Sequence, residues 1–160
     1  MANLQKWSPA NPTFVDIFGT ASADLNIASF NNGLGILGTS VIDNSTNGNL
    51  YCDISYQCTS VSPTGVPTLG FYLLPLLADA TTYADGDNNT TVVANQPTNT
   101  HWLGTIWLRT KASSAQNAML RNLLIPVGKW KFYFVNNSGI TLPSTGTVCQ
   151  ARFYAETNNG

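Results

Sequence analysis

Apolar and polar residues alternate with a period of two along several segments of this 160-residue chain. In residues 50–59, LYCDISYQCT, the even positions are apolar and the odd positions from Asp53 onward are polar. A β-strand places successive side chains on opposite faces, so the pattern predicts a half-buried strand with Asp53 on its polar face. An α-helix repeats every ~3.6 residues and does not sort these residues onto two faces. The alternation therefore predicts a fold built from strands.

Two lysines lie among aromatic residues in a second alternating segment, residues 129–135, KWKFYFV. Trp130, Phe132 and Phe134 share one face, and the other face carries both lysines. Burial of each of these rings contributes about 1.5–3 kcal/mol, which is lost if the rings are held out for bases to stack on. We therefore expect a core strand and no nucleic-acid partner.

Charged residues make up only 9% of the chain, with seven Lys and Arg against eight Asp and Glu. The surface must then be uncharged and polar, made by Asn, Thr, Ser and Gly, which favour turns and exposed strand faces over helix interiors. Low charge also weakens the attraction of a polyanion, which needs several Lys or Arg at one site. The composition disfavours both long helices and nucleic-acid binding.

Predicted strands recur about every 10 to 15 residues with no amphipathic helix between them. This spacing is typical of an antiparallel β-sandwich or barrel. Residues 39–43 and 50–59 flank the sequence NSTNGN, whose Asn47-Gly48 pair suits a tight turn. We therefore expect these two segments to pair with each other as a hairpin.

Further segments complete the predicted set of strands. Residues 69–78, LGFYLLPLLA, are apolar on both faces and should be covered on both sides, while Pro75 lacks a backbone donor and indicates an edge or a bulge. Residues 101–110 form another strand, and residues 118–127, AMLRNLLIPV, fit a helical turn or a strand equally well. The last strand has four inward residues: Cys149, Ala151, Phe153 and Ala155.

Residues 1–24 contain scattered apolar residues without a sustained period. We interpret them as an N-terminal arm that is ordered mainly through its contacts, followed by one sandwich domain over residues 25–160. A first strand and loop packed on the same domain is the alternative. The arm has no signal-peptide organisation, so we expect a chain made in the cytoplasm, and no membrane partner. Its apolar residues are the candidate interface: Trp7, Phe14, Ile17 and Phe18.

The cysteines and the histidine carry no recognisable chemistry. Cys52 and Cys58 are six residues apart on one predicted strand, which separates them by about 20 Å and prevents a disulfide between them. With Cys149 they are interpreted as small apolar core residues. His101 is the single histidine, so a two-histidine metal site is excluded.

An acidic cluster lies in the long predicted loop of residues 79–100. Asp79, Asp85 and Asp87 resemble a loose Ca²⁺ loop, but they lack the register and the terminal Glu of a helix-flanked calcium site. A solvated loop is the other interpretation. We expect no metal, no cofactor and no enzyme activity; a small glycan hydrolase using these carboxylates is the least favoured alternative.

A family resemblance runs through five segments: GTSVIDNSTNGNLYCDISYQC, TLGFYLLPLLADATTYADG, HWLGTIWLR, LLIPVGKWKFYFVNNSGITLPSTG and ARFYAE. Taken in order, they resemble the jelly-roll decoration (cement) proteins of tailed bacteriophages and related head or tail components. The strongest likeness is IPVGKWKFYFVNNSGITLPSTG, similar to a family segment of Pro, Gly, Lys, an aromatic strand and an Asn-Asn turn. Val127 departs from it, because a second proline is frequent there.

The resemblance covers residues 39–156 and implies an all-β jelly-roll sandwich with an extended arm. It also implies a homotrimer on the capsid exterior whose partner is the major capsid protein. No catalytic residue is carried across, because the shared motif is structural. The sequence therefore predicts a non-enzymatic virion protein that binds and reinforces the assembled capsid.

A carbohydrate-binding or receptor-binding module of a phage fibre or tail is the alternative function. It would need exposed aromatic rings to stack on sugars. The candidates for such a platform are Trp102, Trp107 and Tyr83.

Overall fold

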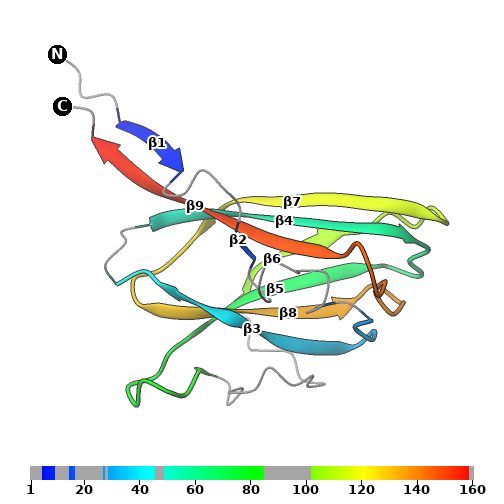
Figure 1. Ribbon diagram of the computed structural model, residues 1–160, viewed down its shortest axis with the longest axis horizontal. Helices are drawn as coiled ribbons and strands as arrows, with labels where there is room; N and C mark the ends of the chain where they lie inside the picture. The colour runs from blue at the N-terminus through cyan, green and yellow to red at the C-terminus, as the bar shows by residue number, and fades with distance from the viewer. Residues whose placement is uncertain are drawn as a thin grey trace.

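The computed structural model describes residues 5–9, 15–16, 27, 29–45, 49–84 and 102–158. Every named element in this part of the chain is a β-strand, as the alternating sequence predicts (Figure 1). The strands are β1 (Gln5–Pro9), β2 (Val15–Asp16), β3 (Leu34–Asp43), β4 (Asn49–Val61), β5 (Thr68–Pro75), β6 (Trp102–Trp107), β7 (Ser114–Leu124), β8 (Lys129–Asn137) and β9 (Val148–Asn158).

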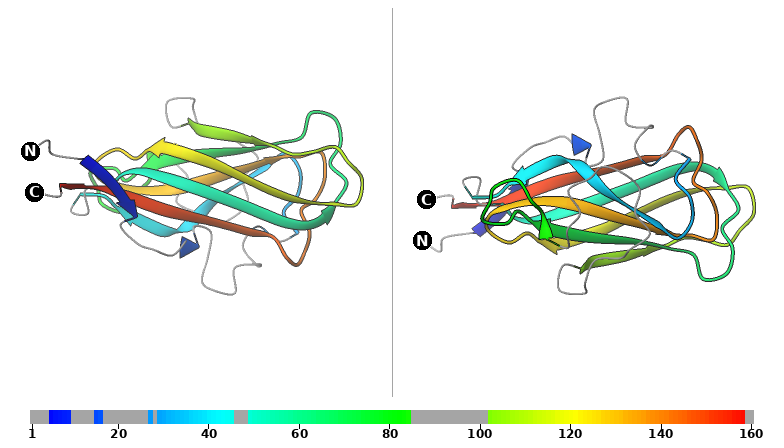
Figure 2. Two further views of the ribbon diagram at one scale, coloured as in Figure 1. Left: turned by 90° about the horizontal axis from the view of Figure 1, so that it is seen from above. Right: turned by 90° about the horizontal axis from the view of Figure 1, so that it is seen from below.

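The strands form two antiparallel sheets. The β4 sheet has the order β1-β9-β4-β7, with β2 also paired to β9, and the β8 sheet has the order β3-β8-β5-β6. The two views of Figure 2 look onto the two sheets from opposite sides of the molecule. The predicted all-β fold of antiparallel sheets is confirmed.

Strand pairs are nested along the chain. β1 and β2 pair with β9, β3 with β8, β4 with β7, and β5 with β6. Two further pairings, β4 with β9 and β5 with β8, join these nested pairs into the sheets. As a result, the outermost strands in sequence are neighbours in space, and the chain folds back on itself about β5 and β6.

The core lies between the two sheets and contains the alternating residues that the sequence indicated. β8 contributes Phe132 and Phe134, both fully buried, and Trp130 packs half-buried against the same cluster. The ring centroid of Phe134 lies 5.4 Å from that of Phe71 and 5.8 Å from that of Phe30. The even residues of β4 are buried as predicted: Cys52, Ile54, Tyr56 and Cys58.

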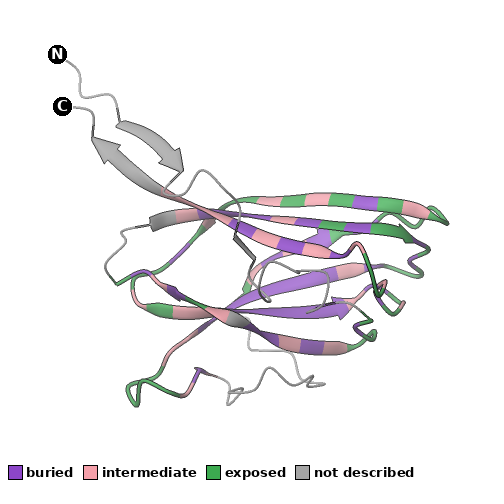
Figure 3. Ribbon diagram, in the orientation of Figure 1, coloured by how far each residue is buried: buried purple, intermediate pink, exposed green. Residues whose placement is uncertain are grey.

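The β8 sheet is also hydrophobic on its outer face. Figure 3 shows β5 and the second half of β8 buried without interruption, whereas β7 and β9 alternate. The prediction that residues 69–78 are covered on both sides is confirmed for β5, whose six central residues are all buried. The outer cluster consists of Leu37, Tyr72, Leu74, Tyr83, Tyr133 and Val135, with Leu76 packed against it.

Both lysines of β8 have partners within the chain. The Nζ atom of Lys129 lies 3.3 Å from Oδ2 of Asp43, and Nζ of Lys131 lies 4.9 Å from the ring centroid of Tyr83. The face of β8 opposite Phe132 and Phe134 therefore also contacts other parts of the chain.

One local prediction is corrected by the strand order. The expected hairpin between residues 39–43 and 50–59 is wrong, because β3 pairs with β8 and lies in the other sheet from β4. Pro75 ends β5, which is an interior strand, but at this residue β5 pairs with β8 alone, so Pro75 lies at a local edge. It is placed beyond Tyr72, the last β5 residue that pairs with β6, so the missing donor is tolerated there. The ambiguous residues 118–124 belong to strand β7.

The first residues of the chain pair with its end. Gln5–Pro9 of β1 align antiparallel with residues 154–158 of β9, and Val15–Asp16 of β2 align with Ala151 and Gln150. For these residues the pairing agrees with the alternative interpretation of the sequence, a first strand packed on the same domain. Contact of residues 1–24 with another molecule stays a prediction.

Removing a core ring should destabilise the fold strongly. Phe134→Ala should lower the free energy of unfolding by about 3–5 kcal/mol, because the ring is fully buried between two other rings. Val127→Ala, at a residue that is 78% exposed, should change it by less than about 0.5 kcal/mol. Urea denaturation of both variants checks this, and equal losses would contradict the assigned core.

Candidate functional site

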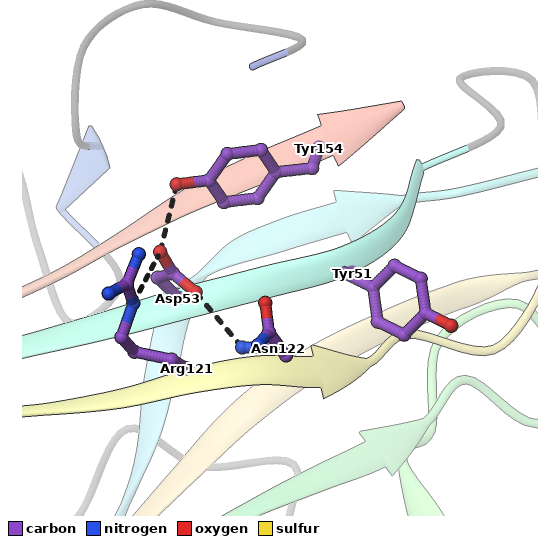
Figure 4. A pocket seen from close by; sticks show the side chains of 5 residues that line it. All are labelled: Tyr51, Asp53, Arg121, Asn122 and Tyr154. Carbon is purple, nitrogen blue, oxygen red and sulfur yellow. Dashed lines mark hydrogen bonds and ion pairs between the residues drawn. The ribbon is translucent and has the colours of Figure 1, made fainter. Parts of the chain in front are cut away.

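A hollow of about 450 Å³ lies on the outer face of the β4 sheet (Figure 4). Its lining comes from three adjacent strands, and we call it the Asp53 hollow. The residues are Tyr51 and Asp53 of β4, Arg121 and Asn122 of β7, and Tyr154 of β9.

Strand register brings these side chains together. Tyr51 is aligned with Tyr154, and Asp53 is aligned with Arg152, across β4 and β9. Directly aligned residues of antiparallel strands point to the same side, so these four share the outer face.

A β-bulge forms the third side of the hollow. Cys52 is aligned with Leu123 and Ile54 with Leu120, so β7 sets two residues, Arg121 and Asn122, against the single residue Asp53. Asn122 has φ of 56°, in the left-handed region that residues other than glycine rarely adopt. The bulge leaves the Asn122 amide without a ladder partner, and the Asp53 side chain accepts it instead.

Asp53 is a carboxylate buried to 1% exposure. Its Oδ1 atom accepts the backbone N–H of Asn122 at 3.0 Å, and Oδ2 accepts the hydroxyl of Tyr154 at 2.8 Å. Oδ2 also lies 3.6 Å from a terminal amino nitrogen of Arg152 and 3.8 Å from Nε of Arg121. Hydrogen bonds and two nearby cations together offset the cost of burying this charge.

The electrostatics of the hollow are dominated by these groups. Two guanidinium groups face one carboxylate, which leaves one positive charge in excess. Burial raises the pKa of Tyr154, and the hydrogen bond to Asp53 and the negative charge of Asp53 raise it further. Arg152 opposes this shift, and its guanidinium lies 5.1 Å from the Tyr154 ring centroid.

The arrangement has a structural task and leaves groups for binding. Structurally, Asp53 links β4 to β7 and β9, because it accepts hydrogen bonds from the backbone N–H of Asn122 in the bulge and from the hydroxyl of Tyr154. The hollow then offers the Arg121 side chain, which is 68% exposed, the exposed Asn122 and two half-buried tyrosine rings. Both Asp53 oxygens are already engaged, so this chemistry suits binding better than proton transfer.

The sequence pattern missed the burial of Asp53. Its placement on the polar face of β4 holds, but the outer side chains cover it, which alternation within one strand does not predict. A signal was present, because aspartate is depleted inside strands and Asp53 stands between Cys52 and Ile54. Its partners Arg121 and Arg152 lie in other strands, and alternation within one strand does not reveal them.

The predicted aromatic residues lie in different environments. Trp107 and Trp102 are 66% and 54% exposed, whereas Tyr83 is only 6% exposed and cannot form part of a sugar platform. Trp7 lies in β1, with its side chain outside the described part of the structure. Phe14, Ile17 and Phe18 lie outside the described residues altogether.

The acidic loop and the cysteines are only partly described. Asp79 accepts the backbone N–H groups of Thr81 and Thr82, which closes a turn, and Asp85, Asp87 and His101 lie outside the described residues. Cys52, Cys58 and Cys149 are buried and form no disulfide. In the described ranges no three His, Cys, Asp or Glu residues are grouped so that they could hold a metal ion.

Comparisons with known proteins give no further guide. No protein-family model, curated protein or solved structure matches the chain. Among the described residues there is no helix of the length and apolarity that a membrane span requires. The functional argument therefore depends on the strand arrangement and on the residues at the surface.

Removal of the buried carboxylate should cost far more stability than removal of an exposed one. Asp53→Ala should lower the free energy of unfolding by about 3–5 kcal/mol, because two arginines and the bulge amide lose their acceptor. Asp43→Ala removes a partly exposed ion pair with Lys129 and two exposed hydrogen bonds from Ser45, and should cost about 1–2 kcal/mol. Guanidinium denaturation measures both, and similar losses would show that Asp53 has no special structural task.

Proposed function

We propose that the protein is a non-enzymatic virion structural protein, a decoration (cement) protein that binds and reinforces an assembled phage capsid. In this proposal it acts as a homotrimer on the capsid exterior, after synthesis in the host cytoplasm. The observation that supports the proposal is the nested pairing of strands in two antiparallel sheets, an arrangement compatible with the sandwich that the resemblance implies.

Jelly-roll topology is the finer fold proposal. A jelly roll is a double sheet of eight strands with two Greek keys, in a class that includes viral capsid domains. Rolling up one long antiparallel ribbon produces it, with the first strand paired to the last and so on inward. The pairs β1 with β9, β3 with β8, β4 with β7, and β5 with β6 support this topology.

The surface suits attachment through uncharged contacts. The chain has few charges, and several large apolar side chains are exposed. Weak contacts of this kind become strong when several copies bind a repeating lattice, because later contacts are effectively intramolecular. The exposed residues include Val41, Val66, Trp102, Trp107, Leu124 and Val127.

The proposed capsid anchors are the aromatic residues of the N-terminal arm. Aromatic side chains dominate interface energetics, and within this segment residues 5–9 and 15–16 pair with β9. In this proposal Trp7, Phe14 and Phe18 contact the capsid.

Two measurements test the proposal. Light scattering of the isolated chain should give about three times the chain mass of 17.2 kDa, and a stable monomer would contradict the trimer.

Cosedimentation with capsids of the encoding phage, prepared without this protein, should show saturable binding. Combined Trp7→Ala, Phe14→Ala and Phe18→Ala should abolish this binding while circular dichroism stays unchanged. Undiminished binding would remove the arm from the proposal.

Carbohydrate binding is the second candidate, because two exposed tryptophans share a face. Trp107 is aligned with Thr68, and Trp102 is aligned with Tyr72 across a register shift. Both partners are even residues of β5, so Trp102 and Trp107 point to the same outer side of edge strand β6. Their aligned partners are four residues apart on β5, which is a separation of about 13 Å.

Trp107→Ala separates the two candidate functions. If the rings bind sugars, a glycan array should lose its signal with this variant while the mass by light scattering stays unchanged. Val66→Ala, at a residue that is 72% exposed, is the matched control and should bind like the original protein. If Trp107→Ala dissociates the trimer instead, the tryptophans belong to the subunit interface.

A further inference from the structure

We propose that the Asp53 hollow binds an acidic saccharide, recognised by a carboxylate on a sugar ring. This site lies on the β4 sheet, apart from the tryptophans of β6, and does not depend on where the protein sits on a virion. The argument uses the charge, the donors and the walls of the hollow.

The charge favours a single negative group. Among the described residues of the hollow, Asp53 neutralises one of the two guanidinium groups around it, so these three side chains together keep one unit of positive charge. A carboxylate matches this excess, whereas a phosphate dianion or a polyanion brings more negative charge than the hollow can balance. The buried Asp53 also repels an anion that enters deeply, so a ligand carboxylate belongs at the exposed rim.

Arg121 is the group placed to receive that carboxylate. Its contact with Asp53 uses Nε, at 3.8 Å, and its side chain is 68% exposed. The two terminal amino groups are thus available to form a forked pair with a carboxylate, the strongest type of hydrogen-bonded ion pair that arginine makes. Figure 4 shows the guanidinium at the side of the hollow, next to Asp53.

The remaining lining suits a hydroxylated ring. Tyr51 and Tyr154, both half-buried, line the hollow, and the C–H face of a sugar packs well against aromatic rings. One face of the Tyr154 ring already meets the Arg152 guanidinium, which leaves the other face for a ligand. The exposed side-chain amide of Asn122 both donates and accepts, as neighbouring hydroxyl groups require. At about 450 Å³ the hollow falls within the range of small-ligand sites.

The backbone at Asn122 is a further indication of a binding site. A left-handed asparagine inside a strand costs conformational energy, and such positions are concentrated at functional sites. Here the bulge turns both Arg121 and Asn122 toward Asp53. A regular strand would place these consecutive residues on opposite faces of the sheet.

Titration calorimetry with sodium glucuronate tests the inference on the full chain. Glucuronate should bind saturably, glucose at least tenfold more weakly, and added salt should weaken glucuronate binding. Arg121→Gln should weaken it at least tenfold, and Arg121→Lys, which keeps the charge but loses the fork, should fall between. Arg109→Gln removes an exposed arginine elsewhere and should leave binding unchanged.

Four outcomes would overturn the proposal. They are no saturable glucuronate binding, glucose binding as tight as glucuronate, inorganic phosphate binding tighter than glucuronate, or equal effects of Arg121→Gln and Arg109→Gln. Because Arg121 is mostly exposed, its variants should keep the fold, which circular dichroism verifies. Loss of glucuronate binding with an intact trimer leaves the proposed capsid function standing, so failure of one proposal does not imply failure of the other.

Discussion

Burial of alternate side chains from β4 and β8 holds the two sheets together, and every other feature of the molecule depends on it. Phe132 and Phe134 of β8 belong to the same core cluster as Ile54 and Tyr56 of β4. With those positions fixed, the residues between them must point outward. The outer face of each sheet is therefore determined by the inner one, because the side-chain period of a strand is two.

The two outer faces are used differently. On the β8 sheet, Tyr133, Val135 and Tyr72 form a second hydrophobic cluster, so this sheet is packed on both sides. On the β4 sheet, polar and aromatic outer residues surround Asp53. The outer face of the β8 sheet is therefore a hydrophobic packing surface, whereas the outer face of the β4 sheet carries the charged and hydrogen-bonding groups of the hollow.

Alternation predicted the strands, but it did not predict their partners. The even residues of β4, the rings of β8 and the inward residues Cys149 and Ala151 of β9 all follow the period of two. The hairpin expected through Asn47-Gly48 failed, because a turn signal indicates a reversal and does not specify whether the next strand stays in the same sheet. Nested pairing joins residues more than 100 positions apart, and no local pattern contains that information.

The candidate site could not be predicted from the sequence, for the same reason. Asp53, Arg121 and Arg152 come from three strands, and the bulge that opposes Asp53 is a property of register. The aspartate between Cys52 and Ile54, inside a predicted strand, was the one visible signal. The sequence did identify Trp102 and Trp107 as aromatic candidates, and these are exposed, but it did not distinguish them from the buried Tyr83.

Cross-strand nuclear Overhauser contacts test the central claim, nested pairing around one core, most directly. The account predicts short backbone proton contacts between the aligned residues Ile36 and Phe134 of β3 and β8, and between Tyr56 and Ala118 of β4 and β7. Contacts linking β3 directly to β4, in place of those between β3 and β8, would contradict it.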